Sequence, residues 1–247
     1  MRRVEIVMAA SLVALVAAGC GAGSPASSGS SSGGASSSSS TPPSSATPST
    51  TAGSPRPSAT PSPVRVLSYR VAYGWGPPGP MSADTSVRHT PHVPPVPQLV
   101  RIGFGRHATS GLSYERLSFT FTHEFPSSDF WFSGTLLTVG TGQVIPKPSA
   151  GGTATEWLGI SFTVAQAHTA SGTSSVLSRP TRPIGGERVV TYVQAGDFEG
   201  GLNYGVLVTW SSAHSDRLIR VVEVETLSSS GQHLFTVAFD LDNTRRS

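Results

Sequence analysis

Four residues whose side chains could bind a carboxylate flank one short loop. Arg106 and His107 lie before the loop. Glu115 and Arg116 lie after it. If the flanking segments are paired strands, these side chains lie next to one another in a hairpin. A guanidinium binds a carboxylate through two parallel hydrogen bonds, so Arg106, His107 and Arg116 are candidate contacts for a peptide stem, a uronic acid or a muramic acid. The structural alternative is that Glu115 pairs with one Arg and the group only fixes the hairpin.

Two further carboxylates, Asp197 and Glu199, lie in the segment 196–200, between glycines. Flanking glycines indicate a tight turn or a bulge. The carboxylates could accept hydrogen bonds from sugar hydroxyls. Calcium needs about six to eight oxygen ligands, and the surrounding spacing supplies no such set, so no metal is expected. The alternative is a turn whose carboxylates accept backbone N–H groups or pair with Arg106 or Arg116, which would unite both motifs.

Aromatic and imidazole side chains form two further groups. Trp75 lies between glycines beside a Pro-rich stretch and is the best candidate for stacking on a sugar ring. Trp157 and Trp210 lie in apolar runs and are expected in the core. His89 and His92 place two imidazoles in the Pro-rich stretch, but their spacing to other residues supplies no further ligand, so we expect no metal site there.

The composition excludes several classes of function. Residues 65–247 contain 14 Lys and Arg against 13 Asp and Glu, without a basic run in the interior, so we expect no nucleic-acid binding. The single Cys excludes a disulfide framework within the chain. The sequence has no G-x-S-x-G, H-E-x-x-H or Walker motif, which favours a non-catalytic protein without a cofactor. A secreted hydrolase without a local sequence mark is the alternative.

The first residues predict export and a lipid anchor. Arg2 and Arg3 precede an uncharged apolar run, residues 6–18, which is shorter than the roughly 20 residues of a membrane-spanning helix. The run ends in Ala17-Ala18-Gly19-Cys20, which resembles the lipobox of bacterial lipoproteins. Residues 1–19 are therefore expected to be a lipoprotein signal peptide and Cys20 the lipidated residue, which anchors the protein at the extracytoplasmic face of the cell membrane. An ordinary secretory signal with an incidental Cys is the alternative.

Residues 20–64 predict a disordered tether. After Cys20, 42 of the 44 positions are Ser, Thr, Pro, Gly or Ala. This composition cannot bury enough apolar surface to offset the entropy of ordering. Residues 65–247 are long enough for one domain with its own core.

This last segment shows the alternation of half-buried strands. Apolar side chains occupy every second position in residues 117–121, 158–164, 206–210 and 235–241. The stretch 76–97 holds seven prolines and cannot be an interior strand. The pattern predicts an all-β fold, an antiparallel β-sandwich or a partly closed barrel of about nine strands. Further strands are expected at residues 65–73, 99–105, 129–138, 187–195 and 217–227, the last one buried on both faces.

Three segments together resemble the AMIN-like domain of secreted proteins and lipoproteins of high-GC Gram-positive bacteria. They are Gly74-Trp75-Gly76 with the later Gly105-Arg106-His107, Tyr114-Glu115-Arg116, and the Gly196–Gly200 block. The resemblance covers about residues 73–242. It implies a β-sandwich related to modules that target envelope proteins to peptidoglycan. The chain carries Gln232-His233 where the family has a Pro and an Arg. A ligand contact of that Arg would therefore be absent here or be made by His233.

Together these observations predict a membrane-anchored surface lipoprotein whose domain binds peptidoglycan or another wall glycan and catalyses no reaction. The alternative from another class is a protein-interaction module of the cell envelope, which docks a partner on an exposed strand edge or on the Pro-rich stretch. The candidate ligand-binding residues are Arg106, His107, Arg116, Asp197, Glu199 and Trp75.

Overall fold

All regular secondary structure in the described part of the chain is β-strand, which confirms the predicted all-β class. The computed structural model describes residues 64–79, 85–109, 111–148, 154–210 and 217–244. The expected signal peptide, Cys20 and almost all of the expected tether lie outside the described residues. Within those residues, no helix long and apolar enough to cross a membrane is present.

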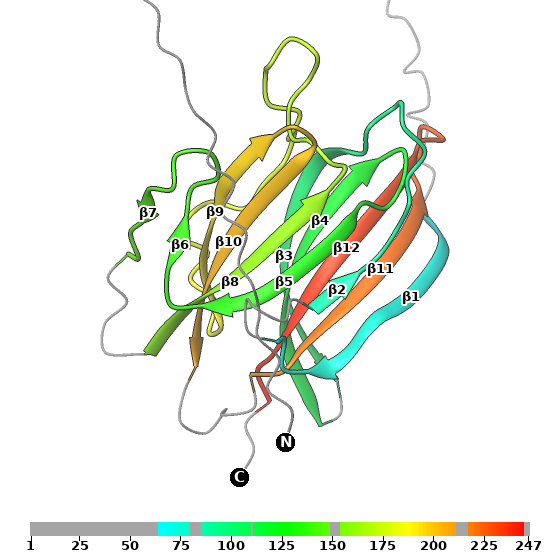
Figure 1. The fold of residues 1–247 in the computed structure, drawn as a ribbon. Coiled ribbons are helices and arrows are strands. Elements are labelled where there is room, and N and C mark those ends of the chain that lie inside the picture. The colour runs from blue at the N-terminus through cyan, green and yellow to red at the C-terminus, as the bar shows by residue number, and fades with distance from the viewer. Residues whose placement is uncertain (1–63, 80–84, 110, 149–153, 211–216, 245–247) are drawn as a thin grey trace, which may run out of the picture. The chain divides into compact units, whose positions relative to one another are not determined.

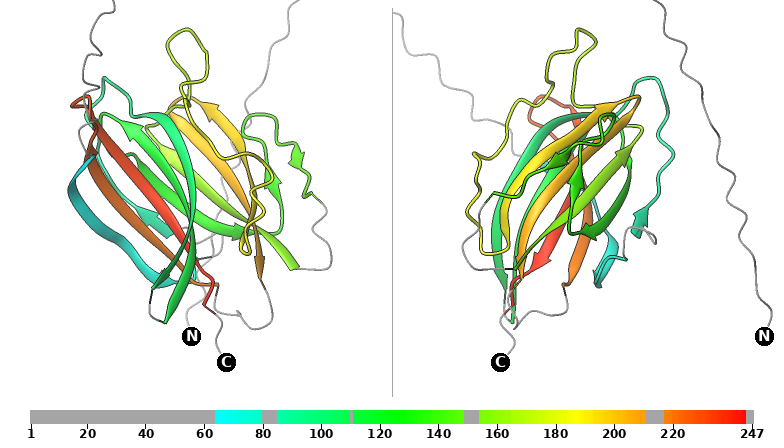
Figure 2. Two further views of the ribbon diagram at one scale, coloured as in Figure 1. Left: turned by 180° about the vertical axis from the view of Figure 1, so that it is seen from behind. Right: turned by 60° about the vertical axis from the view of Figure 1, so that its left-hand side comes forward.

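Two five-stranded antiparallel sheets face each other as a sandwich (Figures 1 and 2). They do not close into a barrel, so the sandwich form of the prediction is correct. We call the two sheets sheet A and sheet B. A two-stranded ribbon, β6 (Leu136–Leu137) and β7 (Val144–Ile145), lies beside sheet B. Sheet A has the order β1 (Arg65–Gly76), β11 (Ile219–Leu227), β12 (His233–Asp242), β4 (Leu112–Thr122) and β3 (Gln98–Thr109). Sheet B has the order β2 (Thr85–Val87), β5 (Ser127–Ser133), β8 (Ala154–Thr163), β10 (Gly201–Trp210) and β9 (Val189–Phe198).

The structure has three strands beyond the nine expected segments, namely β2, β6 and β7. The Pro-rich stretch contains a three-residue strand, β2, which is an edge strand as proline requires. The expected strand 129–138 is interrupted at Gly134 and Thr135, so that β5 stays in sheet B and β6 joins the ribbon. The expected burial of residues 217–227 on both faces is confirmed at Val221 and Val222, which are neighbours and both fully buried.

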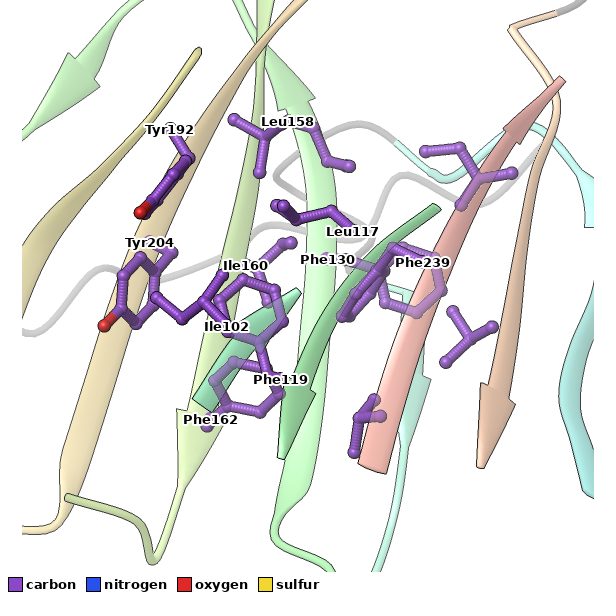
Figure 3. Close-up of a cluster of buried hydrophobic side chains, with 14 of the residues drawn as sticks. Ile102, Leu117, Phe119, Phe130, Leu158, Ile160, Phe162, Tyr192, Tyr204 and Phe239 are labelled. Carbon is purple, nitrogen blue, oxygen red and sulfur yellow. The ribbon is translucent and has the colours of Figure 1, made fainter. Parts of the chain in front are cut away.

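Aromatic side chains from both sheets form the core between them. Phe119 of β4 contacts Phe162 of β8 with ring centroids 5.1 Å apart, and Tyr204 of β10 at 5.0 Å (Figure 3). Phe239 of β12 packs against Phe130 of β5 at 5.5 Å. These pairs join strands of different sheets, because every second side chain of each strand points inward. The sequence alternation therefore determines which residues meet.

One buried carboxylate ties sheet A to the segment that leads into sheet B. Glu115 of β4 is buried, and its carboxylate accepts the backbone N–H groups of residues 187, 188 and 189 at 2.7, 2.9 and 2.8 Å. Arg106 completes the arrangement with Nε 3.3 Å from Glu115 Oε1. Gly186 is required here, since a Cβ at this position would lie 2.3 Å from Glu115 Oε2. Glu115 thus closes one side of the sandwich.

Replacing Glu115 should therefore weaken the fold more than replacing its ion-pair partner. Glu115→Ala leaves three N–H groups and a cation without their acceptor, and we expect the free energy of unfolding to fall by about 3–5 kcal/mol. Arg106→Ala removes a half-exposed partner and should cost less than about 1 kcal/mol. Urea denaturation of both variants measures the difference. Equal losses would contradict the role given to the backbone contacts.

The buried phenol of Tyr204 predicts sensitivity to alkali. Burial raises the pKa of Tyr204 well above its usual value. The unfolded chain ionises near pH 10 while the folded chain stays neutral, so this contribution to stability is complete below that pH. Above about pH 10 the free energy of unfolding should fall, by up to about 1.4 kcal/mol per pH unit for this group. Tyr204→Phe should show a shallower fall in denaturation series from neutral to alkaline pH. Equal slopes for the two proteins would contradict this account.

Candidate functional site

An aspartate shared by two arginines lies on the outer face of sheet A. Asp240 of β12 is fully buried. Arg116 of β4 donates from Nε to Asp240 Oδ1 at 2.6 Å and from Nη2 to Oδ2 at 2.9 Å. Arg220 of β11 donates from Nε and Nη2 to Asp240 Oδ2 at 2.9 and 2.6 Å. One carboxylate therefore orients two guanidinium groups.

Strand register places these three residues in one row. Asp240 is the direct partner of Arg220 on β11 and of Arg116 on β4. The next residues, such as Phe239 and Leu117, point into the core, so the three charged side chains point outward. A charged residue at the outward position of each of three neighbouring strands produces the triad.

Aromatic rings surround the triad. Arg220 Cζ lies 4.8 Å from the ring centroid of Trp75 and 5.0 Å from that of Tyr114. Trp75 and Tyr114 contact each other edge to face at 5.9 Å, and His107 stacks on Tyr114 at 5.0 Å with an interplanar angle of 13°. Such contacts combine cation–π attraction with apolar burial. We call Trp75, His107, Tyr114, Arg116, Arg220 and Asp240 the aromatic–arginine cluster.

Gly105 leaves space for the imidazole ring of His107. A Cβ at Gly105 would lie 3.1 Å from His107 Nε2, which shows that the imidazole lies across the backbone of its own strand. The side chains of Arg106 and His107 then point to opposite faces of β3. His107 joins the aromatic–arginine cluster, whereas Arg106 joins Glu115 and donates to the carbonyl oxygen of Gly185 at 3.0 Å.

The charge of the aromatic–arginine cluster is positive. Two guanidinium groups share one carboxylate, which leaves the triad a net charge of about +1. The hydrogen bond to Asp240 raises the pKa of Arg116 above its usual value, against the opposing effect of burial. The contacts described use two of the five N–H groups of each Arg. The cluster can therefore attract an anion and present rings to a sugar.

The acidic motif lies in sheet B and belongs to a turn. Glu199 and Gly200 connect β9 to β10 as a two-residue turn, and both have positive φ, 50° and 74°. Asp197 Oδ2 accepts the backbone N–H of Ala167 at 3.1 Å and lies 2.8 Å from Nδ1 of His168. The expected tight turn is therefore confirmed.

Of the two structural alternatives for the acidic motif, the structure shows the carboxylate that accepts a backbone N–H group, at Asp197, and not the pairing with Arg106 or Arg116. Arg106 binds Glu115 and Arg116 binds Asp240, both within sheet A or its rim. Of the six candidate residues, the structure gathers Trp75, His107 and Arg116 in one place. It puts Arg106 on the opposite face of β3, and Asp197 and Glu199 at the β9–β10 turn.

Three other histidines, His89, His92 and His233, each lie beside a carboxylate. His89 Nε2 lies 2.6 Å from Oε1 of the buried Glu223, and His92 contacts the exposed Glu124. The hydrogen bond from the backbone of His92 lowers the pKa of Glu124. Across the described ranges, no group of three or more His, Cys, Asp or Glu could hold a metal ion. His233 pairs with Glu225 at 2.7 Å and makes no described contact with the cluster.

Sequence reasoning missed two members of the cluster as site residues, Arg220 and Asp240. Each is a charged residue with apolar neighbours on both sides in the sequence. Opposite charges at such positions of neighbouring strands predict a cross-strand pair once the register is known. Tyr114 was recognised only as part of a motif. The expected core positions of Trp157 and Trp210 are confirmed.

Comparisons with family models, with curated proteins and with solved structures found no match for the chain. The resemblance to the AMIN-like domain therefore stays a prediction from the motifs.

The shared carboxylate predicts strong coupling between the two arginines. Arg116→Gln or Arg220→Gln alone leaves Asp240 one cation and should cost about 1–2 kcal/mol of unfolding free energy. The double variant leaves a buried carboxylate without a cation, and its loss should exceed the sum by at least about 1 kcal/mol. Urea denaturation of the complete cycle measures this coupling.

A matched cycle provides the control. Arg88 and Arg217 pair at the surface with different carboxylates, Asp129 and Glu156, so Arg88→Gln and Arg217→Gln should be additive. Additive losses in the Arg116–Arg220 cycle as well would contradict the shared-carboxylate account.

Proposed function

We propose that the protein is a lipid-anchored surface protein whose β-sandwich binds an anionic wall glycan, such as peptidoglycan, without catalysing a reaction. The observation that carries this proposal is the aromatic–arginine cluster. It combines a ring, Trp75, for the apolar face of a sugar with two fixed guanidinium groups for a carboxylate. The lipobox-like segment that ends at Cys20 supports an anchor at the extracytoplasmic face of the membrane.

The charge of the ligand follows from the charge of the cluster. The triad carries a net positive charge, and Tyr114 and His107 extend it with two stacked rings. Peptidoglycan carries carboxylates on its lactyl and peptide groups next to sugar rings, which fits this combination. Long-range attraction of an anionic ligand to the triad weakens as the Debye length falls from about 10 Å at about 0.1 M salt to about 3 Å at about 1 M.

A second candidate function has its own observation. The edge strand β1 exposes apolar side chains, among them Val66 at 61%, Tyr69 at 57% and Val71 at 47%. An open strand edge with apolar side chains can pair with a strand of another protein. We propose a protein partner of the envelope as the alternative ligand of the domain.

Binding to the wall should depend on Trp75. Residues 21–247 should co-sediment saturably with purified wall sacculi. Trp75→Ala should weaken this binding about two- to tenfold, because a stacked ring contributes about 0.5–1.5 kcal/mol. Raising the salt should weaken wild-type binding as well. Phe198→Ala is the matched control, because it removes an exposed aromatic side chain beside the β9–β10 turn, outside the aromatic–arginine cluster.

The outcomes separate the two functions. Loss of binding in Trp75→Ala but not in Phe198→Ala supports the cluster as the wall-binding site, provided that both variants unfold at the wild-type urea concentration. A folded wild-type protein that stays in the supernatant at every salt concentration would contradict wall binding and favour the protein partner.

Membrane attachment should depend on Cys20. In a Gram-positive host, Cys20→Ser should move the protein from the membrane fraction to the medium or the wall fraction, because the variant lacks the thiol that would carry the proposed lipid. Metabolic labelling with a clickable fatty acid checks the modification directly. A labelled Cys20→Ser variant, or a wild-type protein without label, would contradict the lipid anchor.

A further inference from the structure

The ribbon β6–β7 lies beside sheet B, on the side of the molecule away from β1 and β11 of sheet A (Figures 1 and 2). The backbone N–H of Val139 donates to the carbonyl oxygen of Ala195 on β9 at 2.8 Å. Leu136 is buried with Trp157 and Leu207 in a second apolar cluster, separate from the main core. Thr138 closes the ribbon turn with a 2.8 Å backbone hydrogen bond to residue 143. The ribbon is thus a fixed wall.

Three glycines of sheet B let this wall approach closely. A Cβ at Gly205 would lie 2.1 Å from Leu136 Cδ2, and one at Gly196 would lie 2.6 Å from Val139 Cβ. A Cβ at Gly159 would lie 2.5 Å from Trp131 Cε2, so the indole lies against the bare strand. Gly159 on β8 pairs with Trp131 on β5 and with Gly205 on β10, so these three positions lie in one row of the sheet. Residues without side chains therefore shape this face.

A pocket of about 230 Å³ remains between the ribbon and the sheet. Its lining includes Trp131 of β5, Leu137 and Val139 of the ribbon and its turn, and Asn203 of β10. An apolar cavity of roughly 150 Å³ is large enough to bind benzene, so this pocket has room for an aromatic ring with a substituent. The ribbon contacts and the glycines show that the pocket exists without a ligand.

The lining defines the chemistry of a ligand. None of the residues that line the pocket is charged, and its exposed surface is mostly apolar. Ser133 Oγ is already engaged with the backbone of Thr135. Among the described residues, the Asn203 amide makes no side-chain hydrogen bond, which leaves it available as both donor and acceptor. A charged ligand would lose its hydration without an ionic partner here.

We propose that this pocket binds a neutral, mainly apolar ring group that stacks on Trp131 and exchanges one hydrogen bond with Asn203. This proposal goes beyond wall binding, because the aromatic–arginine cluster lies on the other sheet and selects anions. One protein molecule can therefore hold both ligands at once, one on each outer face of the sandwich.

The neutral fluorescent amine N-phenyl-1-naphthylamine is a suitable probe, because it has two aromatic ring systems and one N–H. Residues 21–247, which contain every described residue, should bind one probe per chain, with a blue shift and a saturable rise of its emission. Asn203→Asp places a carboxylate in the pocket on the side of sheet B, and Leu137→Asp places one on the side of the ribbon. Each should weaken binding at least tenfold. Both positions are partly exposed, so the fold should tolerate the changes.

Gln232→Glu adds the same charge in the exposed turn before β12 and should leave probe binding unchanged. Wall binding of Asn203→Asp should also stay unchanged, which distinguishes failure of this proposal from failure of the proposed function. No saturable binding by the wild-type protein would overturn the pocket proposal. Undiminished binding by both pocket variants, with unfolding transitions like the wild type, would overturn it as well, since the probe would then lie elsewhere.

Discussion

The fixed position of Asp240 is the interaction on which the outer face of sheet A depends. A buried carboxylate needs cations and hydrogen bonds, and Asp240 obtains both from strands on either side, through Arg220 and Arg116. In satisfying Asp240, the two guanidinium groups become planar supports for the rings of Trp75 and Tyr114. The aromatic–arginine cluster therefore forms because Asp240 is buried in sheet A and needs the two arginines to neutralise its charge.

The outer faces of the two sheets differ in charge and in the size of their side chains. On sheet A, large charged and aromatic side chains fill the surface and leave a cationic platform. On sheet B, Gly159, Gly196 and Gly205 remove side chains so that a ribbon and an indole can approach the backbone, and a neutral hollow is left between them. Glu115 holds the sandwich closed at the side where β4 meets the segment before β9. The frame thus keeps two chemically different surfaces apart.

The sequence alternation predicts the fold class and most of the strands, since burial on one face imposes a period of two. The alternation cannot predict the register of paired strands, and the register determines which side chains of the site are neighbours. Asp240 meets Arg116 and Arg220 only because β12 lies between β4 and β11, an order that local sequence does not encode. The same limit explains why the sequence left two alternatives open for Asp197, a backbone N–H group or an Arg, between which the structure selects the backbone of Ala167, with His168 beside it. The glycines of the Gly105 and Gly196 motifs were recognised, but their neighbours, His107 and Val139, become visible only in space.

The central claim is that the aromatic–arginine cluster itself contacts an anionic wall glycan. Nuclear magnetic resonance can follow the side-chain Nε–H signals of Arg116 and Arg220 and the indole N–H of Trp75 while soluble peptidoglycan fragments are added to the labelled domain. The account predicts that these three signals shift together and saturably, while the indole signal of Trp131 on sheet B stays in place. Saturable shifts confined to other residues, or no shift with fragments at high concentration, would contradict it.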